Sequence, residues 1–275
     1  MQLEIVLPAH NEERRIGRTL QRYCRAISDP GVRFVVALDG CTDGTAAVVQ
    51  RHRRVDPRIG MLELPKLGKG GAVAEALRRT SAPLVAFVDA DGATPPSELL
   101  RLVDAVADDR ADIAIASRWH PAAVLPARRS VGRQLTSAGF AGAIRALFGL
   151  PHLDTQCGAK VLRRRAVDLL TPLLSSRDFL VDVDLLVSAR DLGLRVAELP
   201  TVWVDQDGSK LSAGRDARRM AASALRLWLH RRVLPRPVRG DAPRWTPATA
   251  SVRPHPVLEL VEQPRPSEAE RLVRA

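Results

Sequence analysis

Two aspartates separated by one residue are the clearest candidates for chemistry in this 275-residue chain. Asp89 and Asp91 follow the apolar run 84–88, which predicts a buried strand. Residues i and i+2 at the end of a strand point the same way, so both carboxylates can face one point. Two hard oxygen ligands of this kind suit Mg²⁺ or Mn²⁺ carrying a diphosphate. The alternative is that the pair caps the following helix.

A glycine-rich segment around Lys69 is the second candidate. Gly68, Gly70 and Gly71 surround this lysine just before a predicted helix. Glycines let the backbone approach an anion closely, and the helix N-terminus adds the positive end of its dipole. Lys69 adds a full charge. The spacing of a Walker A loop is absent, and an ordinary flexible turn is the alternative.

These residues need a scaffold that brings several strand ends together. Apolar runs predict strands at 3–7, 33–38, 61–64, 84–88 and 113–116, and helical spacing predicts helices at 14–26, 45–52, 70–79 and 96–107. The alternation predicts an α/β fold, a Rossmann-like and mostly parallel sheet flanked by helices. Ligands of such sheets bind beyond the carboxyl ends of the strands, where acids, glycines and an asparagine recur in this chain.

The positive charge is concentrated in the C-terminal half. The net charge is +11, and residues 215–239 carry eight arginines against one acid. Such a field implies an anionic partner: a phosphate-bearing substrate, an acidic membrane or a nucleic acid. No apolar run reaches the roughly 18–20 residues that a spanning helix needs.

Three segments follow from these patterns. Residues 1–212 form the expected catalytic domain, 213–234 a basic amphipathic helix, and the proline-rich stretch 235–275 a disordered tail. The basic helix fits a position on an anionic lipid surface, and packing on its own domain is the alternative. Its predicted apolar face is formed by Met220, Ala224, Leu225, Leu227 and Trp228.

Four motifs in order give the chain a specific resemblance. They are Pro-Ala-His-Asn-Glu at 8–12, Asp-Gly-Cys-Thr-Asp-Gly-Thr at 39–45, Gly-Lys-Gly-Gly-Ala-Val at 68–73 and Asp-Ala-Asp-Gly-Ala-Thr at 89–94. Together they resemble family 2 glycosyltransferases with a GT-A fold. The strings 154–160 and 208–211 narrow the resemblance to the dolichyl- and polyprenyl-phosphate glucosyltransferases and mannosyltransferases, nearest the glucosyl branch. The similarity covers about residues 3–233.

The resemblance implies two groups of donor-site residues. The nucleotide sugar is implied to be held by Pro8, His10, Glu12, Asp39, Lys69 and Asp89. Asp89 and Asp91 match the metal-binding Asp-x-Asp motif, so Mg²⁺ or Mn²⁺ is the implied cofactor. His10 replaces a commoner tyrosine, and Leu38-Asp39 replaces a pair of acids.

The same resemblance implies an acceptor site. The acceptor phosphate is implied to be bound by Arg118, Arg129, Arg133 and Lys210, because guanidinium groups suit phosphate oxygens. Asp182 and Asp184 are the candidate catalytic residues, as a base or in orienting the acceptor. Helix capping by Asp182 is the alternative. A phosphate acceptor is already an anion at neutral pH and needs no strong base, whereas a hydroxyl acceptor does.

We therefore expect a metal-dependent, inverting hexosyltransferase. Glucose is favoured over mannose, so UDP-glucose is the first candidate donor and GDP-mannose the second, with a polyprenyl phosphate as acceptor. A soluble hydroxyl acceptor is the alternative, and a basic nucleic-acid-binding module is a distant one, because aspartates at the strand ends repel phosphates. We expect a cytoplasmic protein, peripheral at the membrane surface, with a membrane-anchored protein as a further candidate partner and no nucleic acid.

Overall fold

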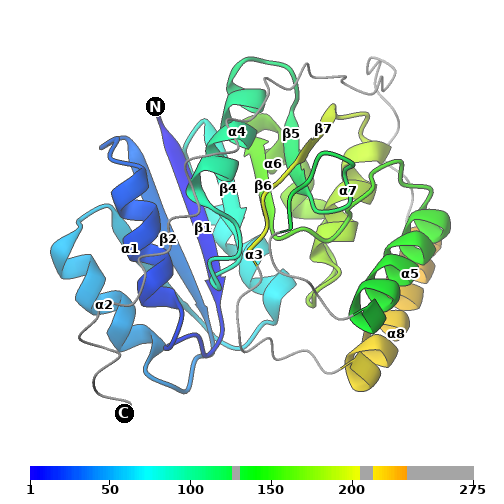
Figure 1. The fold of residues 1–275 in the computed structure, drawn as a ribbon, viewed down its shortest axis with the longest axis horizontal. Coiled ribbons are helices and arrows are strands. Elements are labelled where there is room, and N and C mark those ends of the chain that lie inside the picture. The colour runs from blue at the N-terminus through cyan, green and yellow to red at the C-terminus, as the bar shows by residue number, and fades with distance from the viewer. Residues whose placement is uncertain (126–130, 205–212, 234–275) are drawn as a thin grey trace, which may run out of the picture.

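A seven-stranded sheet forms the centre of the molecule (Figure 1). The computed structural model describes residues 1–125, 131–204 and 213–233, of which the side chains of 131–137, 213–219 and 233 lie outside the description. The elements in chain order are β1 (Leu3–Ala9), α1 (Ile16–Ala26), β2 (Val32–Asp39), α2 (Thr45–Val55), β3 (Ile59–Leu64), α3 (Lys69–Arg79), β4 (Leu84–Val88), α4 (Pro96–Ala107), β5 (Ile113–Ser117), α5 (Val131–Phe148), β6 (Ala159–Arg163), α6 (Arg164–Leu170), a 3₁₀ turn (Thr171–Leu173), α7 (Val181–Asp191), β7 (Val196–Pro200) and α8 (Ala213–Val233).

The sheet confirms the predicted mostly parallel α/β architecture. Its strand order is β3-β2-β1-β4-β6-β5-β7, in which β3, β2, β1 and β4 run parallel, as do β5 and β7. Only β6, within the described residues, runs antiparallel to its neighbours β4 and β5. The sequence analysis did not predict β6 or α6. The strand has five residues, of which the second is Lys160 and the last is Arg163, so it lacks the apolar run that marked the other strands.

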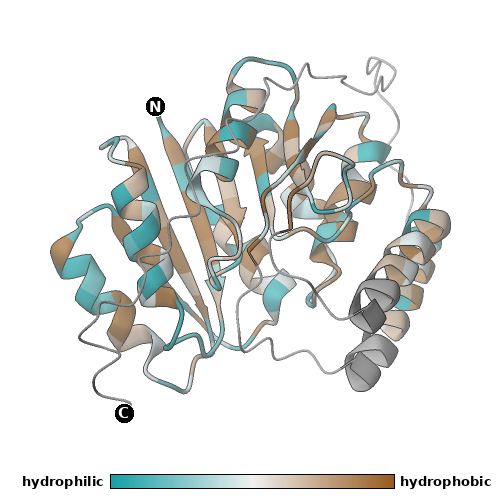
Figure 2. Ribbon diagram, in the orientation of Figure 1, coloured by the Kyte–Doolittle hydropathy of each residue, from teal (hydrophilic) through white to brown (hydrophobic). Residues whose placement is uncertain are grey.

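Helices cover both faces of the sheet and enclose two hydrophobic cores. The helices α1, α2 and α4 pack on one face, and α3, α6 and α7 pack on the other. The strands between them are largely apolar, as the brown arrows in Figure 2 show. Most of the polar side chains that could do chemistry therefore lie at the strand ends, and the buried Lys160 of β6 is an exception.

The helix α8 lies beside α5 at one edge of the molecule (Figure 1). Its Ala224 and Leu227 are buried in the second core, as the predicted apolar face requires. Leu225 was placed on the same face, but the structure exposes 54% of it, and Leu229 is 50% exposed. The buried stripe is therefore narrower than the sequence suggested, and apolar side chains also face outward. No helix in the described part of the chain is long and apolar enough to cross a membrane.

Candidate active site

The antiparallel strand β6 brings two distant motifs together at the end of β4. Val88 pairs with Ala159, so the residues that follow β4 meet those that precede β6. The N–H of Asp89 donates to the carbonyl oxygen of Gly158 at 3.1 Å. A Cβ added to Gly158 would lie 1.9 Å from Oδ2 of Asp89. Glycine at this position therefore makes the room that the Asp89 carboxylate occupies.

Four side chains of alternating charge lie in contact one after another, from Asp89 at the end of β4 to the buried Lys160. Nζ of Lys69, at the start of α3, lies 2.8 Å from Oδ1 of Asp89 and 3.5 Å from Oδ2 of Asp182. On the other side of Asp182, Nζ of Lys160 lies 2.6 Å from Oδ1. Lys160 is fully buried and also donates to the carbonyl oxygen of Cys157 at 2.6 Å. Each inner charge thus has an opposite charge in contact with it.

The pKa shifts agree with this alternation. Burial by itself lowers the pKa of Lys69, but the carboxylates of Asp89 and Asp182 outweigh it and raise the pKa above its usual value. Burial likewise works to raise the pKa of Asp182, but Lys160 and Lys69 outweigh it and hold the pKa below its usual value. Both groups are consequently charged at neutral pH, and Asp182 is a poor proton acceptor.

Asp91 lies two residues beyond Asp89 in the loop after β4. Its Oδ1 accepts the N–H of Ala93 at 2.9 Å. Burial, followed by the charge of Asp89, raises the pKa of Asp91 above its usual value. A cavity of about 200 Å³ opens beside it, lined by Arg15, Arg18, Thr19, Arg22, Asp91 and Gly92.

The helix α1 fixes the backbone that carries the two aspartates. The hydroxyl of Thr19 donates to the carbonyl oxygen of Ala90 at 2.9 Å, and the hydroxyl of Tyr23 donates to that of Thr94 at 3.0 Å. Gly92, between them, has a φ of 75°, which favours glycine. The loop after β4 is therefore held on one side by β6 and on the other by α1.

The pair of carboxylates suits a small divalent cation. Among the described residues, no three His, Cys, Asp or Glu side chains cluster as a complete metal cage. Mg²⁺ is commonly held by one or two carboxylates, with substrate phosphates and waters completing its shell. Asp89 and Asp91 supply that donor set, and a cation between them offsets their mutual repulsion.

The predicted nucleotide loop forms a connected network at the ends of β1 and β2. Nδ1 of His10 lies 2.6 Å from the carbonyl oxygen of Asp39, and its Nε2 lies 3.4 Å from Nζ of Lys66. Because a carbonyl only accepts, Nδ1 carries the proton and Nε2 is the acceptor. Oδ1 of Asp39 accepts the N–H groups of Leu67 and Gly68 at 2.5 and 3.1 Å.

The other predicted donor-loop residues lie at the same edge of the sheet. Pro8 is half-buried near the end of β1. Glu12 forms a two-point ion pair with Arg15, at 2.6 and 2.7 Å. The structure thus brings Pro8, His10, Glu12 and Asp39 to neighbouring strand ends; their roles toward a nucleotide stay predictions.

The predicted acceptor arginine Arg118 already has an anionic partner within the chain. Its guanidinium group contacts both carboxylate oxygens of Asp154, at 2.7 and 3.0 Å, and lies 5.0 Å from the centre of the Trp203 ring. This explains the first residue of the 154–160 string. Arg129, Lys210 and the side chain of Arg133 lie outside the described residues.

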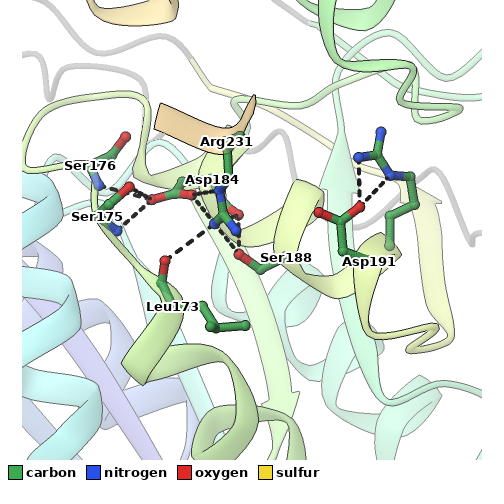
Figure 3. Close-up of polar contacts among 8 residues, drawn as sticks. Leu173, Ser175, Ser176, Asp184, Ser188, Asp191 and Arg231 are labelled. Atoms are coloured by element: carbon green, nitrogen blue, oxygen red, sulfur yellow. Dashed lines mark hydrogen bonds and ion pairs between the residues drawn. The ribbon is translucent and has the colours of Figure 1, made fainter. Parts of the chain in front are cut away.

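Asp184, the second candidate catalytic residue, is fully buried and engaged on both oxygens (Figure 3). Oδ2 accepts the N–H groups of Ser175 and Ser176 at 2.7 and 2.8 Å. Oδ1 forms an ion pair with Arg231 of α8, whose Nε lies 3.1 Å away. This acid therefore holds a loop and a helix in place.

The glycines around Lys69 are used differently from the predicted approach to an anion. A Cβ on Gly68 would lie 2.2 Å from the carbonyl oxygen of Arg177, and a Cβ on Gly70 would lie 2.2 Å from that of Ser176. The loop 175–178 thus occupies the space that these glycines leave, and it lies directly on the start of α3.

The comparisons with known proteins agree with this geometry. The family profile described as "Glycosyl transferase family 2" matches residues 4–170, which is more than half of the chain. The chain belongs to glycosyltransferase family 2. The resemblance read from the motifs is thereby confirmed.

Two curated relatives are similar over most of this family 2 chain. "Glycosyltransferase AglD" of Haloferax volcanii is 32% identical over 241 residues, covering 86% of this chain and 38% of that protein. "Dolichyl-phosphate beta-glucosyltransferase ALG5C" of Trichomonas vaginalis is 32% identical over 219 residues, covering 75% of this chain and 65% of that protein. The chain therefore spans well under half of the first relative and just under two thirds of the second.

The solved structures show the same fold. Glucosyl-3-phosphoglycerate synthase from Mycobacterium tuberculosis, in complex with Mn²⁺, uridine diphosphate and glucosyl-3-phosphoglycerate, superposes with a TM-score of 0.62. It is 22% identical, and the match covers 82% of this chain and 79% of that one. The expected GT-A fold is confirmed.

The sequence analysis missed several residues that build the site. It did not assign to the active site Gly158, Lys160, the loop 175–178 or Arg231. The signal for the first two was the string 154–160, which contains a lysine in a chain whose basic residues are otherwise nearly all arginine. The loop and Arg231 carried no local signal.

We predict that Lys160→Met destabilises the fold by about 3–5 kcal/mol at neutral pH, because it leaves Asp182 buried without its closest counter-ion. Urea unfolding measures the loss. Without Lys160, the pKa of Asp182 is higher than in the wild type, so its carboxyl takes up a proton at a higher pH. The deficit therefore shrinks as the pH is lowered, whereas wild-type Asp182, with its lowered pKa, keeps its stabilisation down to about pH 4.

The matched control is Arg78→Met, which removes a partly exposed partner of Glu75 on α3. It is expected to cost no more than about 1 kcal/mol. An equal loss from both variants, or a deficit for Lys160→Met that does not change with pH, would contradict the prediction.

Proposed function

We propose that the protein transfers a hexose from a nucleotide diphosphate sugar to a polyprenyl phosphate, with inversion at the anomeric carbon. Glucose carried by UDP is the favoured donor, because the chain is similar to a dolichyl-phosphate beta-glucosyltransferase. GDP-mannose is the second candidate. Pro8, His10, Glu12 and Asp39 are proposed to hold the nucleotide at the ends of β1 and β2.

One observation carries the choice of acceptor. Both candidate bases have cations against them: Lys160 and Lys69 contact Asp182, and Arg231 contacts Asp184. The pKa of Asp182 is held below its usual value, so this carboxylate takes up a proton poorly, and both oxygens of Asp184 are already engaged. A hydroxyl acceptor needs a base, whereas a phosphate acceptor attacks as the anion that it already is at neutral pH. The arrangement therefore favours a phosphate acceptor.

In this proposal Lys69 acts on the leaving group. Negative charge develops on the diphosphate as the bond to the sugar breaks, and a fixed cation beside it stabilises the transition state. Asp182 and Lys160 are positioning residues, since they hold Lys69 between two carboxylates. Arg118, Arg129, Arg133 and Lys210 are proposed to receive the acceptor phosphate on the opposite face of the sugar.

A divalent cation is part of the proposal, held by Asp89 and Asp91. The structural neighbour contains Mn²⁺ together with uridine diphosphate, which supports a cation of this class. When bound, Mg²⁺ or Mn²⁺ supplies charge neutralisation to the departing diphosphate. Gly158 leaves the space in which the Asp89 carboxylate takes its position.

The decisive experiment is an acceptor assay. Purified protein is mixed with Mg²⁺, a short polyprenyl phosphate and radiolabelled UDP-glucose or, separately, GDP-mannose, and then extracted into organic solvent. We expect label in the organic phase from one donor. Asp91→Asn should reduce it by about 100-fold or more, since several kcal/mol of charge stabilisation depend on the bound cation.

Asp108→Asn, an exposed acid at the end of α4, is the control and should retain activity. Full activity of a folded Asp91→Asn variant would overturn the metal assignment. Label that stays in the aqueous phase with both donors would replace the lipid phosphate with a soluble acceptor.

A second prediction concerns the space beside Asp89. Gly158→Ala places a methyl group where Oδ2 of Asp89 lies, so the carboxylate must move. We expect the affinity for Mn²⁺ in the presence of UDP to fall by about ten-fold or more, about 1.4 kcal/mol, in a spin-resonance titration. Gly60→Ala is the control, because its Cβ would only touch the carbonyl oxygen of Phe34 at 3.6 Å. Equal affinities for the two variants would contradict the prediction.

We further propose that α8 lies on an anionic membrane surface at the cytoplasmic face, where a polyprenyl phosphate would be found. Leu225 and Leu229 are each at least half exposed on this helix, and Arg226 and Arg232 are exposed near them. Apolar side chains next to arginines are typical of an interfacial helix.

The membrane proposal predicts that the protein floats with vesicles of phosphatidylcholine and phosphatidylglycerol. Replacing Leu225 and Leu229 together with serine should abolish flotation, because the helix loses the apolar side chains that enter the lipid. Val55→Ser, which changes an 87% exposed side chain on α2, should leave it intact. Flotation of the double variant at the wild-type level would show that α8 is not the contact.

A further inference from the structure

The guanidinium group of Arg231 joins α8 to α7 through an ion pair with Asp184 (Figure 3). It also donates to the carbonyl oxygen of Leu173 at 3.2 Å and to the hydroxyl of Ser188. Asp184 is fully buried, so this arginine neutralises a charge that water does not reach. Removing one partner of such a buried ion pair strongly destabilises the fold, because the other charge is left without a counter-ion.

The other oxygen of Asp184 holds a loop. It accepts the N–H groups of Ser175 and Ser176, at 2.7 and 2.8 Å, and the hydroxyl of Ser175 at 3.1 Å. These contacts fix the chain just before the carbonyl groups of Ser176, Arg177 and Asp178. The ion pair with α8 and the position of this loop therefore depend on the same carboxylate.

That loop in turn lies on the residues that flank Lys69. The N–H of Gly70 donates to the carbonyl oxygen of Arg177 at 3.1 Å. The same carbonyl would lie 2.2 Å from a Cβ on Gly68, and that of Ser176 would lie 2.2 Å from a Cβ on Gly70. The first residues of α3 are thus packed against the loop on both sides of the lysine.

We infer that Arg231 and Asp184 are positioning residues for Lys69, so that docking of α8 on the domain sets the cation that serves the leaving diphosphate. That Lys69 binds the leaving diphosphate rests on the proposed function. That Arg231 and Asp184 position Lys69 rests only on the contacts described above. It runs from Arg231 through Asp184 and the loop 175–178 to Lys69 and Asp89. A helix proposed to lie on the membrane is in this way joined to the donor site.

Amide hydrogen exchange tests the connection without any substrate. Arg231→Gln should speed exchange by about ten-fold or more at Ser175 and Ser176 and also at Gly70, because each of these N–H groups depends on the loop position. Exchange in β1 should not change. Faster exchange at the two serines with no change at Gly70 would overturn the inference.

The matched control is Arg190→Gln. Arg190 also pairs with an acid of α7, Asp191, at 2.7 Å, and donates to the carbonyl oxygen of Phe148. Within the described part of the chain, its guanidinium group donates to Asp191 and Phe148 and to no residue of the loop 175–178. It should leave exchange at Gly70 at the wild-type rate, and an equal effect of the two variants would overturn the inference.

Binding of nucleoside diphosphate tests whether the effect acts through Lys69. With Mn²⁺ and either UDP or GDP, Lys69→Met and Arg231→Gln should each weaken binding in calorimetry. Their combination should bind as weakly as Lys69→Met alone, because both remove the same contact. If the fold-loss of affinity in the double variant equals the product of the two single fold-losses, Arg231 acts independently of Lys69. That result would give Arg231 a merely structural role and overturn the inference.

Arg231→Lys carries the same tests if Arg231→Gln unfolds by circular dichroism. It keeps a positive charge beside Asp184 but replaces the planar guanidinium group, whose Nε and Nη2 both donate here, with a single ammonium nitrogen, so we expect smaller changes in the same direction. Faster exchange at Ser175 and Ser176 with no change at Gly70 would again overturn the inference. Neither exchange nor diphosphate binding involves the acceptor. Failure of sugar transfer to lipid with these results intact would therefore reject the proposed acceptor and leave the role of Arg231 standing.

Discussion

Burial of the Lys160 ammonium group beside Asp182 is the constraint on which the rest of the site depends. A charge without water is stable only with an opposite charge and hydrogen bonds in contact with it. Lys160 meets that requirement with Asp182 and the carbonyl of Cys157, and Asp182 meets it with Lys160 and Lys69. Asp182 thereby helps to fix the ammonium group of Lys69, which also contacts Asp89.

The same rule explains why so few acids of the site are available as bases. Asp154 is held by Arg118, and Asp184 by Arg231. These carboxylates organise arginines and loops, and the Arg118 guanidinium group holds the pKa of Asp154 below its usual value. A transferase whose acceptor is itself an anion loses nothing by this arrangement, because no proton has to be removed from the nucleophile.

The strand β6 has a role beyond completing the sheet. It is antiparallel to β4, so its N-terminal end lies where β4 ends. Gly158 therefore meets Asp89, and Lys160, two residues later, points into the layer that contains α7. Parallel pairing would have placed these residues at the far edge of the sheet, away from the aspartates.

Much of this protein can be predicted from local patterns. The alternating strands and helices, the acids at the strand ends and the order of the family motifs were all read from the sequence, because each depends on residues that are neighbours in the chain. Asp89, Asp91 and Lys69 were singled out in this way. Their placement at one edge followed from the rule for parallel sheets.

The partners of the charged residues were decided only by tertiary structure. The structure pairs Arg118 with Asp154 and Asp184 with Arg231, and neither pairing could be predicted from the sequence. These contacts join residues 36 and 47 positions apart. Periodicity reveals which face of an element is buried, but a buried charge is satisfied by whichever opposite charge the fold brings to it, and spacing along the chain does not encode that choice.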